Sequence, residues 1–188
     1  MKIKAVERIV KNVRQIRIHN DPRYGQWIEA GGAMYPLEGL PRISGDQLLA
    51  LLDVPEDKRN GYEVINSDTL PRLFDYEDST EKEEALETSF IRINYCGTVF
   101  EAVATDSGMV FIDIKLLKPF DDLENGIALF ERRTVSGDTY IAVKSGLLLK
   151  GIILPAKCIS ERLSDELTRI AKLTALALEN DTNGVVEE

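Results

Sequence analysis

Two carboxylates and a lysine fall close together in the sequence and could support metal-dependent chemistry. On a β-strand Asp113 and Lys115 share one face, and Asp106 lies at the preceding turn. Carboxylates that hold Mg²⁺ beside a lysine that helps to activate water are the parts of a metal-dependent nuclease. Asp-x-Lys is nevertheless a very common tripeptide, and a solvated strand face is the simpler interpretation. The nuclease is kept as an alternative, with no metal and no catalytic residue assigned.

A serine and two lysines could carry out a second chemistry, acyl transfer by a serine–lysine dyad. Ser107 precedes Lys144 and Lys150, and an unprotonated, desolvated lysine can act as the base for a serine nucleophile. Self-cleaving repressor-type peptidases carry Gly-Asp-Ser-Met at this point, whereas the chain reads Thr-Asp-Ser-Gly-Met at 105–109. Because Asp-Ser-Gly is an ordinary turn, we rank the peptidase below the nuclease.

The remaining polar candidates favour structural roles. His19 is the single histidine, so a Ser-His or Cys-His mechanism would need it as the base, and a two-histidine metal site is impossible. It lies beside a turn, and we expect a surface or turn residue. Asp121, Asp122 and Glu124 lack the alternating oxygen ligands of a calcium loop and are predicted to cap or turn the chain. No phosphate-binding glycine motif is present, and we predict no cofactor.

Three aromatic residues, Tyr24, Trp27 and Tyr35, allow two interpretations. They could form a stacking surface for a base or a peptide. Aromatic residues of a hairpin more often pack across strands, which is the role that we predict here.

Composition limits the partners and the compartment. The 23 basic and 32 acidic residues give a net charge of −9 and a pI near 4.8, which disfavours bulk nucleic-acid binding but leaves room for a local basic strip. Cys96 and Cys158 have no CxxC partner, as expected in a reducing compartment. No signal peptide and no apolar run of roughly 18 residues is visible. We therefore expect a cytoplasmic protein without membrane contact.

The first part of the chain, 1–74, is predicted to contain a helix, a hairpin and a second helix. Apolar residues recur at helical spacing from Val6 to Ile16. Gly31 and Gly32 suit a tight hairpin turn between 26–30 and 33–35. Ser44 and Gln47 form a capping box that opens a helix over 44–53. A strand is predicted at 62–65.

The second part, 88–180, is predicted to be an antiparallel meander followed by an amphipathic helix over 159–179. Its strand-like runs are separated by turn residues and cover 90–95, 99–105, 109–115, 127–133, 139–144 and 147–154. Between the two parts, 75–87 is dense in acidic residues and is predicted to be a solvated connector. The expected fold class is α+β, with a curved antiparallel sheet covered by the C-terminal helix. If 109–114 is outermost, its open edge favours self-association.

Distinctive runs occur at 26–28 and 33–37 (Gln-Trp-Ile and Ala-Met-Tyr-Pro-Leu), at 129–134 (Leu-Phe-Glu-Arg-Arg-Thr) and at 140–149. Together they resemble small uncharacterised proteins encoded in prophages and mobile elements of Gram-positive bacteria. This resemblance spans most of the chain; it implies a genomic setting and no catalytic residue. The runs 100–106 and 152–157 look like the strand-turn and strand-helix entries of DNA sliding-clamp repeats.

The function expected from the sequence is that of a non-enzymatic interaction or regulatory accessory protein. Its partner would be another protein, which the sequence does not identify, and a homo-oligomer is expected. A clamp-like module of DNA metabolism and the metal-dependent nuclease are the alternatives.

Overall fold

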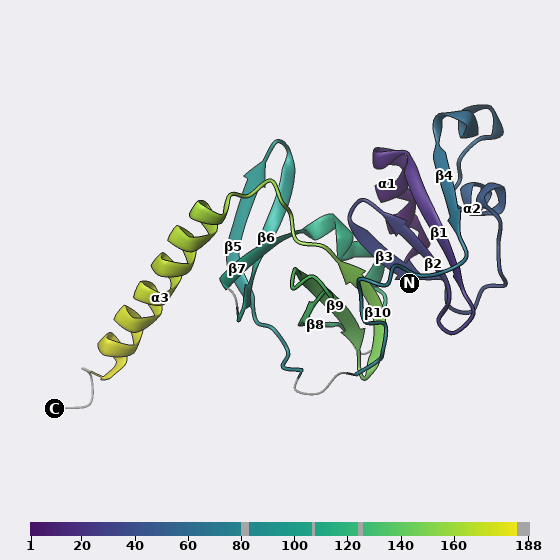
Figure 1. The fold of residues 1–188 in the computed structure, drawn as a ribbon. Coiled ribbons are helices and arrows are strands. Elements are labelled where there is room, and N and C mark those ends of the chain that lie inside the picture. The colour runs from purple at the N-terminus through teal and green to yellow at the C-terminus, as the bar shows by residue number, and fades with distance from the viewer. Residues whose placement is uncertain (80–82, 107, 124–125, 184–188) are drawn as a thin grey trace.

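The chain folds into an α+β structure with a mixed seven-stranded sheet and a separate three-stranded antiparallel sheet (Figure 1). The computed structural model describes residues 1–79, 83–106, 108–123 and 126–183. The helices are α1 (Ile3–Val13), α2 (Gly45–Leu51), α3 (Glu161–Asn183) and the short 3₁₀ turns η1 (Glu56–Gly61), η2 (Ile114–Leu116) and η3 (Lys118–Phe120). The strands are β1 (Gln15–Asp21), β2 (Gly25–Ala30), β3 (Ala33–Pro36), β4 (Glu63–Ser67), β5 (Thr88–Tyr95), β6 (Thr98–Thr105), β7 (Gly108–Asp113), β8 (Ala128–Arg133), β9 (Thr139–Ser145) and β10 (Leu148–Ile153).

The larger sheet has the strand order β4-β1-β2-β3-β10-β9-β8, so it joins strands from both sides of the acidic segment. Its strands are antiparallel except for β1 and β4, which run parallel. The prediction of one antiparallel sheet is therefore wrong, because β5, β6 and β7 form a sheet of their own and one pair is parallel. Parallel neighbours need a crossover connection, and α2 with η1 lies in the connection that leads to β4.

Local signals placed the β2–β3 turn and the start of α2 correctly, but strand β1 was not predicted and the expected helix-hairpin-helix arrangement is not shown. Gly31 and Gly32 make the predicted turn with φ of 63° and 88°. Ser44 and Gln47 form the predicted capping box at the start of α2. Between α1 and α2, however, β1, β2 and β3 form a three-stranded meander, since α1 ends at Val13 and the following residues pair with β2.

The C-terminal helix α3 covers only the small sheet. Leu167 and Ala171 pack against a buried cluster on β6 and β7 that includes Phe100 and Phe111. Ile170 and Leu173 of α3 remain 55% and 58% exposed, and the helix extends away from the rest of the molecule (Figure 1). Among the described residues, no helix combines the length and the apolar character needed to cross a bilayer.

The outer edge of β7 is blocked by the segment that leads into α3. The Ala156 amide donates to the Phe111 carbonyl at 2.7 Å, and the Ser164 hydroxyl donates to the Met109 carbonyl. The prediction of self-association through 109–114 assumed an open strand edge. Two carbonyls of this edge are already occupied by hydrogen bonds within the chain.

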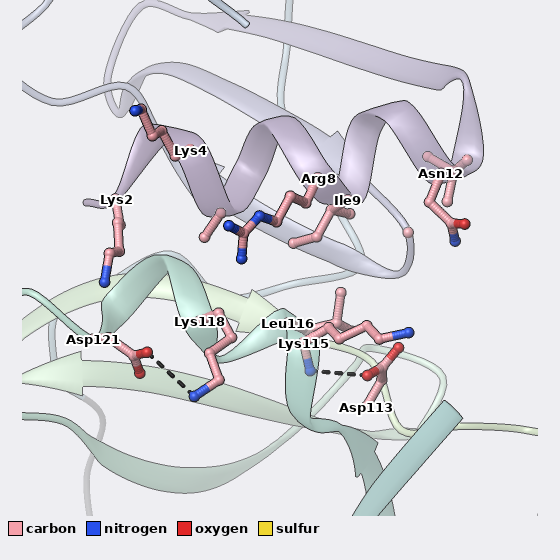
Figure 2. Close-up of a pocket in the computed structure, with 13 residues that line it drawn as sticks. Lys2, Lys4, Arg8, Ile9, Asn12, Asp113, Lys115, Leu116, Lys118 and Asp121 are labelled. Carbon is pink, nitrogen blue, oxygen red and sulfur yellow. Dashed lines mark hydrogen bonds and ion pairs between the residues drawn. The ribbon is translucent and has the colours of Figure 1, made fainter. Parts of the chain in front are cut away.

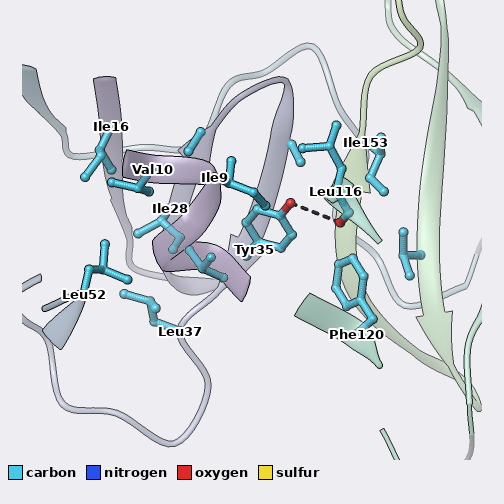
Figure 3. Packing of buried hydrophobic residues seen from close by; sticks show 14 of the residues in the cluster. Ile9, Val10, Ile16, Ile28, Tyr35, Leu37, Leu52, Leu116, Phe120 and Ile153 are labelled. Carbon is cyan, nitrogen blue, oxygen red and sulfur yellow. Dashed lines mark hydrogen bonds between the residues drawn. The ribbon is translucent and has the colours of Figure 1, made fainter. Parts of the chain in front are cut away.

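The main core lies between α1, the seven-stranded sheet and the turns η2 and η3 (Figure 3). Tyr35 is fully buried there; its hydroxyl donates to the Leu116 carbonyl at 3.1 Å, and burial raises the pKa of this hydroxyl well above its usual range. Trp27 is also buried, and its indole N–H donates to the Tyr24 carbonyl at 2.9 Å. The prediction that these aromatic residues pack inside the protein is confirmed for Trp27 and Tyr35.

Candidate functional site: a cationic groove

A groove of about 650 Å³ runs between helix α1 and the turns η2 and η3 (Figure 2). One wall comes from the first thirteen residues of the chain, and the other from 113–121. The residues that line it are Lys2, Lys4, Ala5, Arg8, Ile9, Asn12, Val13, Gly31, Asp113, Lys115, Leu116, Lys118 and Asp121.

The charged side chains of the groove are mostly basic. Its described lining holds the cations Lys2, Lys4, Arg8, Lys115 and Lys118 against the carboxylates Asp113 and Asp121. Lys118 lies 3.3 Å from Asp121. The other four cations are exposed and form no ion pair with any described residue. The groove is thus a local positive region on a chain whose net charge is −9.

The amphipathic pattern of α1 aims part of this charge into the groove. Ala5, Val6, Ile9 and Val10 are buried, which leaves the opposite face to polar side chains. Lys4 and Arg8 are one turn apart and lie on the same side of the helix. The first turn of α1 contains no acidic residue, although acidic side chains are favoured there and cations are disfavoured by the helix dipole. Lys4 therefore gains no stabilisation from the helix dipole.

The second wall is held in place by hydrogen bonds and by the core. The Asp113 carboxylate accepts a hydrogen bond from the Lys115 amide at 2.9 Å and caps η2 (Figure 2). Phe120 is buried and packs 5.5 Å from the Tyr35 ring. The Lys2 amide donates to the Pro119 carbonyl at 2.7 Å, which joins the start of α1 to η3. The two walls are thus fixed relative to one another before any ligand binds.

The floor of the groove is apolar. Ile9 and Leu116 are almost fully buried beneath it, and Val13 remains 38% exposed. Gly31 adds no side chain: a Cβ atom there would lie 2.9 Å from Ile9 Cγ2 and 3.7 Å from Leu116 Cδ2. The glycine of the β2–β3 turn therefore lets the turn approach α1 closely.

The predicted nuclease residues do not assemble into a metal site. Asp106 precedes β7 and Asp113 ends it, so the length of a six-residue strand, roughly 20 Å at about 3.3 Å per residue, separates them. One Mg²⁺ ion cannot bind both carboxylates at its usual distance of about 2 Å. Lys115 is not on the strand, because the chain turns into η2 at Ile114. Among the described residues, no three or more His, Cys, Asp or Glu side chains are grouped to hold a metal ion.

The predicted serine–lysine dyad is not supported at its lysines. Lys144 is buried and lies 2.7 Å from the Glu83 carboxylate, and Lys150 lies 2.7 Å from Glu38. Ser107 lies outside the described residues.

The prediction that His19 is a surface or turn residue is wrong. Its side chain is 2% exposed in β1, between β2 and β4. Nδ1 lies 3.0 Å from the Thr69 carbonyl and Nε2 lies 2.9 Å from the Glu29 carboxylate. The hydrogen bond from His19, with a smaller contribution from Arg17, lowers the pKa of Glu29. With both ring nitrogens engaged and no exposure, His19 does not meet the access requirement of a general base.

Most described residues of the acidic segment 75–87 are exposed, but the segment also makes specific contacts with the large sheet. Tyr76 is buried among Trp27 and Phe74, and the Asp78 carboxylate accepts a hydrogen bond from the Leu149 amide at 2.9 Å. The Leu86 amide donates to the Leu129 carbonyl at 2.7 Å. The described parts of the segment, 75–79 and 83–87, therefore lie against strands β8 to β10, and we call them the strap.

A buried charge cluster anchors this strap. Glu83 lies 2.5 Å from Arg132 and 2.7 Å from Lys144, and the three side chains are 8%, 4% and 5% exposed. Lys144 also sits 4.7 Å from the centre of the Phe130 ring. Charged side chains can be buried without a large loss of stability only when opposite charges lie close together. Here the negative charge is that of Glu83, which belongs to the strap.

The carboxylates at the end of η3 have local roles, in line with the predicted turn chemistry. Asp121 pairs with Lys118, and Asp122 lies 3.7 Å from the amino group of Met1. Glu124 lies outside the described residues.

Sequence reasoning missed the groove because its walls are about 110 residues apart in the chain. Amino-acid composition does not reveal a local cluster of basic residues, and the negative net charge of the chain does not suggest one. One signal was present: Lys4 and Arg8 share a polar face of the first helix, without an acidic residue in its first turn.

Comparisons with known proteins identify no relative of the chain. Neither a protein-family model, nor a curated protein, nor a solved structure matches the chain. The two runs that look like clamp repeats lie in different sheets, since 100–106 covers β6 and its turn whereas 152–157 follows from β10. Their placement gives the clamp alternative no support.

Proposed function

We propose that this protein is a non-catalytic interaction protein that binds an anionic partner in the groove between α1 and the turns η2 and η3. One observation carries the proposal. Lys2, Lys4, Arg8 and Lys115 line the groove, are exposed, and pair with no described carboxylate, although acidic residues outnumber basic ones in the chain. An interface that recognises a charged partner presents complementary charge in this way.

The geometry of the other candidates also favours binding over catalysis. The acidic residues proposed for metal binding lie at opposite ends of β7, and Lys144 is engaged with Glu83. A catalytic site brings a nucleophile or base within hydrogen-bonding distance of its partner in an accessible pocket. The groove has cations and an apolar floor, which suit binding. The sequence resemblance implies only a prophage setting, and we extend the proposal to an accessory or regulatory role in that setting.

Binding to an acidic polymer tests the function directly. Fluorescence anisotropy with labelled poly-L-glutamate should show saturable binding that weakens as salt is added, because the contacts are between exposed charges. Arg8→Glu should weaken binding at least roughly tenfold, since it replaces a central attraction by a repulsion.

Lys58→Glu is the matched control. Lys58 is exposed in η1, away from the groove, and the substitution changes the net charge by the same amount. Both variants should unfold at the same urea concentration as the wild type, which separates binding from folding. Equal binding losses in the two variants would mean that only mean charge matters, and the groove would have no specific role.

A further inference from the structure

The groove has two ends of different character. Toward the start of α1, Lys2 points across the groove toward Lys118 and Asp121, and Arg8 lies midway along the helix; Lys4 lines the rim, with its amine on the other side of α1 (Figure 2). Basic side chains dominate this charged end.

Toward the end of α1 the lining combines apolar side chains with the amide of Asn12, and its charged residues balance. Ile9, Val13 and Leu116 come together there above Gly31. The two charged residues of this end, Lys115 and Asp113, have opposite signs. An anion is therefore attracted to the charged end of the groove, and an apolar group can be buried from water against Val13 at the other end.

We infer that the partner is an acidic protein segment in which a cluster of carboxylates lies next to apolar side chains. The carboxylates would contact Lys2, Lys4 and Arg8, and the adjoining apolar side chains would cover Val13, the exposed apolar residue of the groove. This inference rests on the proposed function and specifies the ligand of the same groove. A volume of about 650 Å³ accommodates a few side chains, so the recognised element is short.

Nucleic acid fits this lining less well. Proteins that bind single strands combine cations with aromatic side chains on which bases stack, and the described lining contains no aromatic residue. A long polyanion would also extend beyond the groove into the field of a chain with net charge −9. A free phosphate would leave the apolar end uncovered.

Peptides of equal composition test the segregation of charge and apolar groups. The block peptide has four glutamates followed by two leucines, a second peptide has the reverse order, and a third alternates the residues. We expect the better of the two block orders to bind at least roughly fivefold more tightly than the alternating peptide, because only it covers both ends at once.

Variants of the two ends complete the experiment. Arg8→Glu should weaken both poly-L-glutamate and the block peptide, whereas Val13→Ser should weaken only the block peptide and remove its advantage. Val13 is the last residue of α1 and is partly exposed, so the substitution should leave the fold intact. Lys58→Glu again controls for net charge.

The possible failures are distinguishable. If poly-L-glutamate binds in the groove but block and alternating peptides bind equally, the acidic–apolar segment is refuted and the anion-binding function stands. If no anionic probe binds, both fail. If an oligo(dT) of matched charge binds more tightly than the block peptide and Val13→Ser has no effect, the partner is a nucleic acid and the inference is wrong.

Discussion

In the groove beside α1, Lys2, Lys4 and Arg8 are exposed and pair with no described carboxylate, whereas under the acidic strap Arg132 and Lys144 are buried and both pair with Glu83. The two regions contain similar residues in opposite surroundings. A buried charge destabilises the fold unless a counter-charge neutralises it, so the Glu83 cluster is part of what holds the strap in place. An exposed cation remains solvated until a partner arrives, so the groove can be altered without loss of the fold.

The largest expected effect is at Glu83. Glu83→Gln leaves Arg132 and Lys144 buried without a counter-charge and should lower the free energy of unfolding by about 3–5 kcal/mol. Urea denaturation followed by the fluorescence of Trp27, the single tryptophan, measures this. Glu84→Gln, at an exposed neighbour, should change stability by no more than about 0.5 kcal/mol. A loss below about 1 kcal/mol at Glu83 would contradict the structural role of the cluster.

Replacing Glu83, Arg132 and Lys144 together by methionine should restore most of that loss, because apolar groups of similar size need no counter-charge. Failure to recover would show that packing rather than charge dominates the cluster.

Gly31 links the groove to the core, and Gly32 offers a matched comparison. Both have positive φ, but a Cβ atom on Gly31 meets Ile9, whereas nothing lies within 4 Å of one on Gly32. Gly31→Ala should lower the free energy of unfolding by about 1–3 kcal/mol, and by more than Gly32→Ala does. It should also weaken poly-L-glutamate binding. Equal losses of stability in the two variants would mean that backbone strain alone causes the destabilisation, and that the close contact between Gly31 and Ile9 contributes nothing.

Lys4→Glu should make the protein slightly more stable and bind less well. An acidic residue in the first turn of α1 interacts favourably with the helix dipole, which is worth about 0.3–1 kcal/mol. The lost contact should weaken poly-L-glutamate binding roughly tenfold. Urea denaturation and anisotropy on the same preparation measure both effects. A destabilised variant with unchanged binding would show that Lys4 serves the fold.

The smallest effect concerns the pair His19–Glu29, which is intermediate in exposure. The hydrogen bond from His19 lowers the pKa of Glu29 below its ordinary value of 4.5. Glu29 therefore contributes stability above that value and loses it as the pH falls through its lower folded pKa. The difference in unfolding free energy between wild type and Glu29→Gln should shrink as the pH falls below 4.5 and through the lower folded pKa of Glu29. A difference that does not change with pH would refute the coupling.

Local chemistry made part of the fold predictable. The capping box at Ser44, the Gly31–Gly32 turn and the strands of the meander each depend on residues close in sequence, and each is present. The assignments that failed depend on distant contacts. Three features follow from which strands become neighbours. They are the separate sheet of β5 to β7, the burial of His19 and the anchoring of the strap by Glu83.

By itself, the sequence determined where α2 begins and where the β2–β3 hairpin turns, because capping and backbone preferences act over a few residues. Tertiary structure alone decided which charges are buried and paired, and which line a groove. The reason is that the role of a charged side chain depends on its surroundings within a few ångströms, and Arg8 and Lys118 become opposite walls of one groove only after α1 packs beside η3.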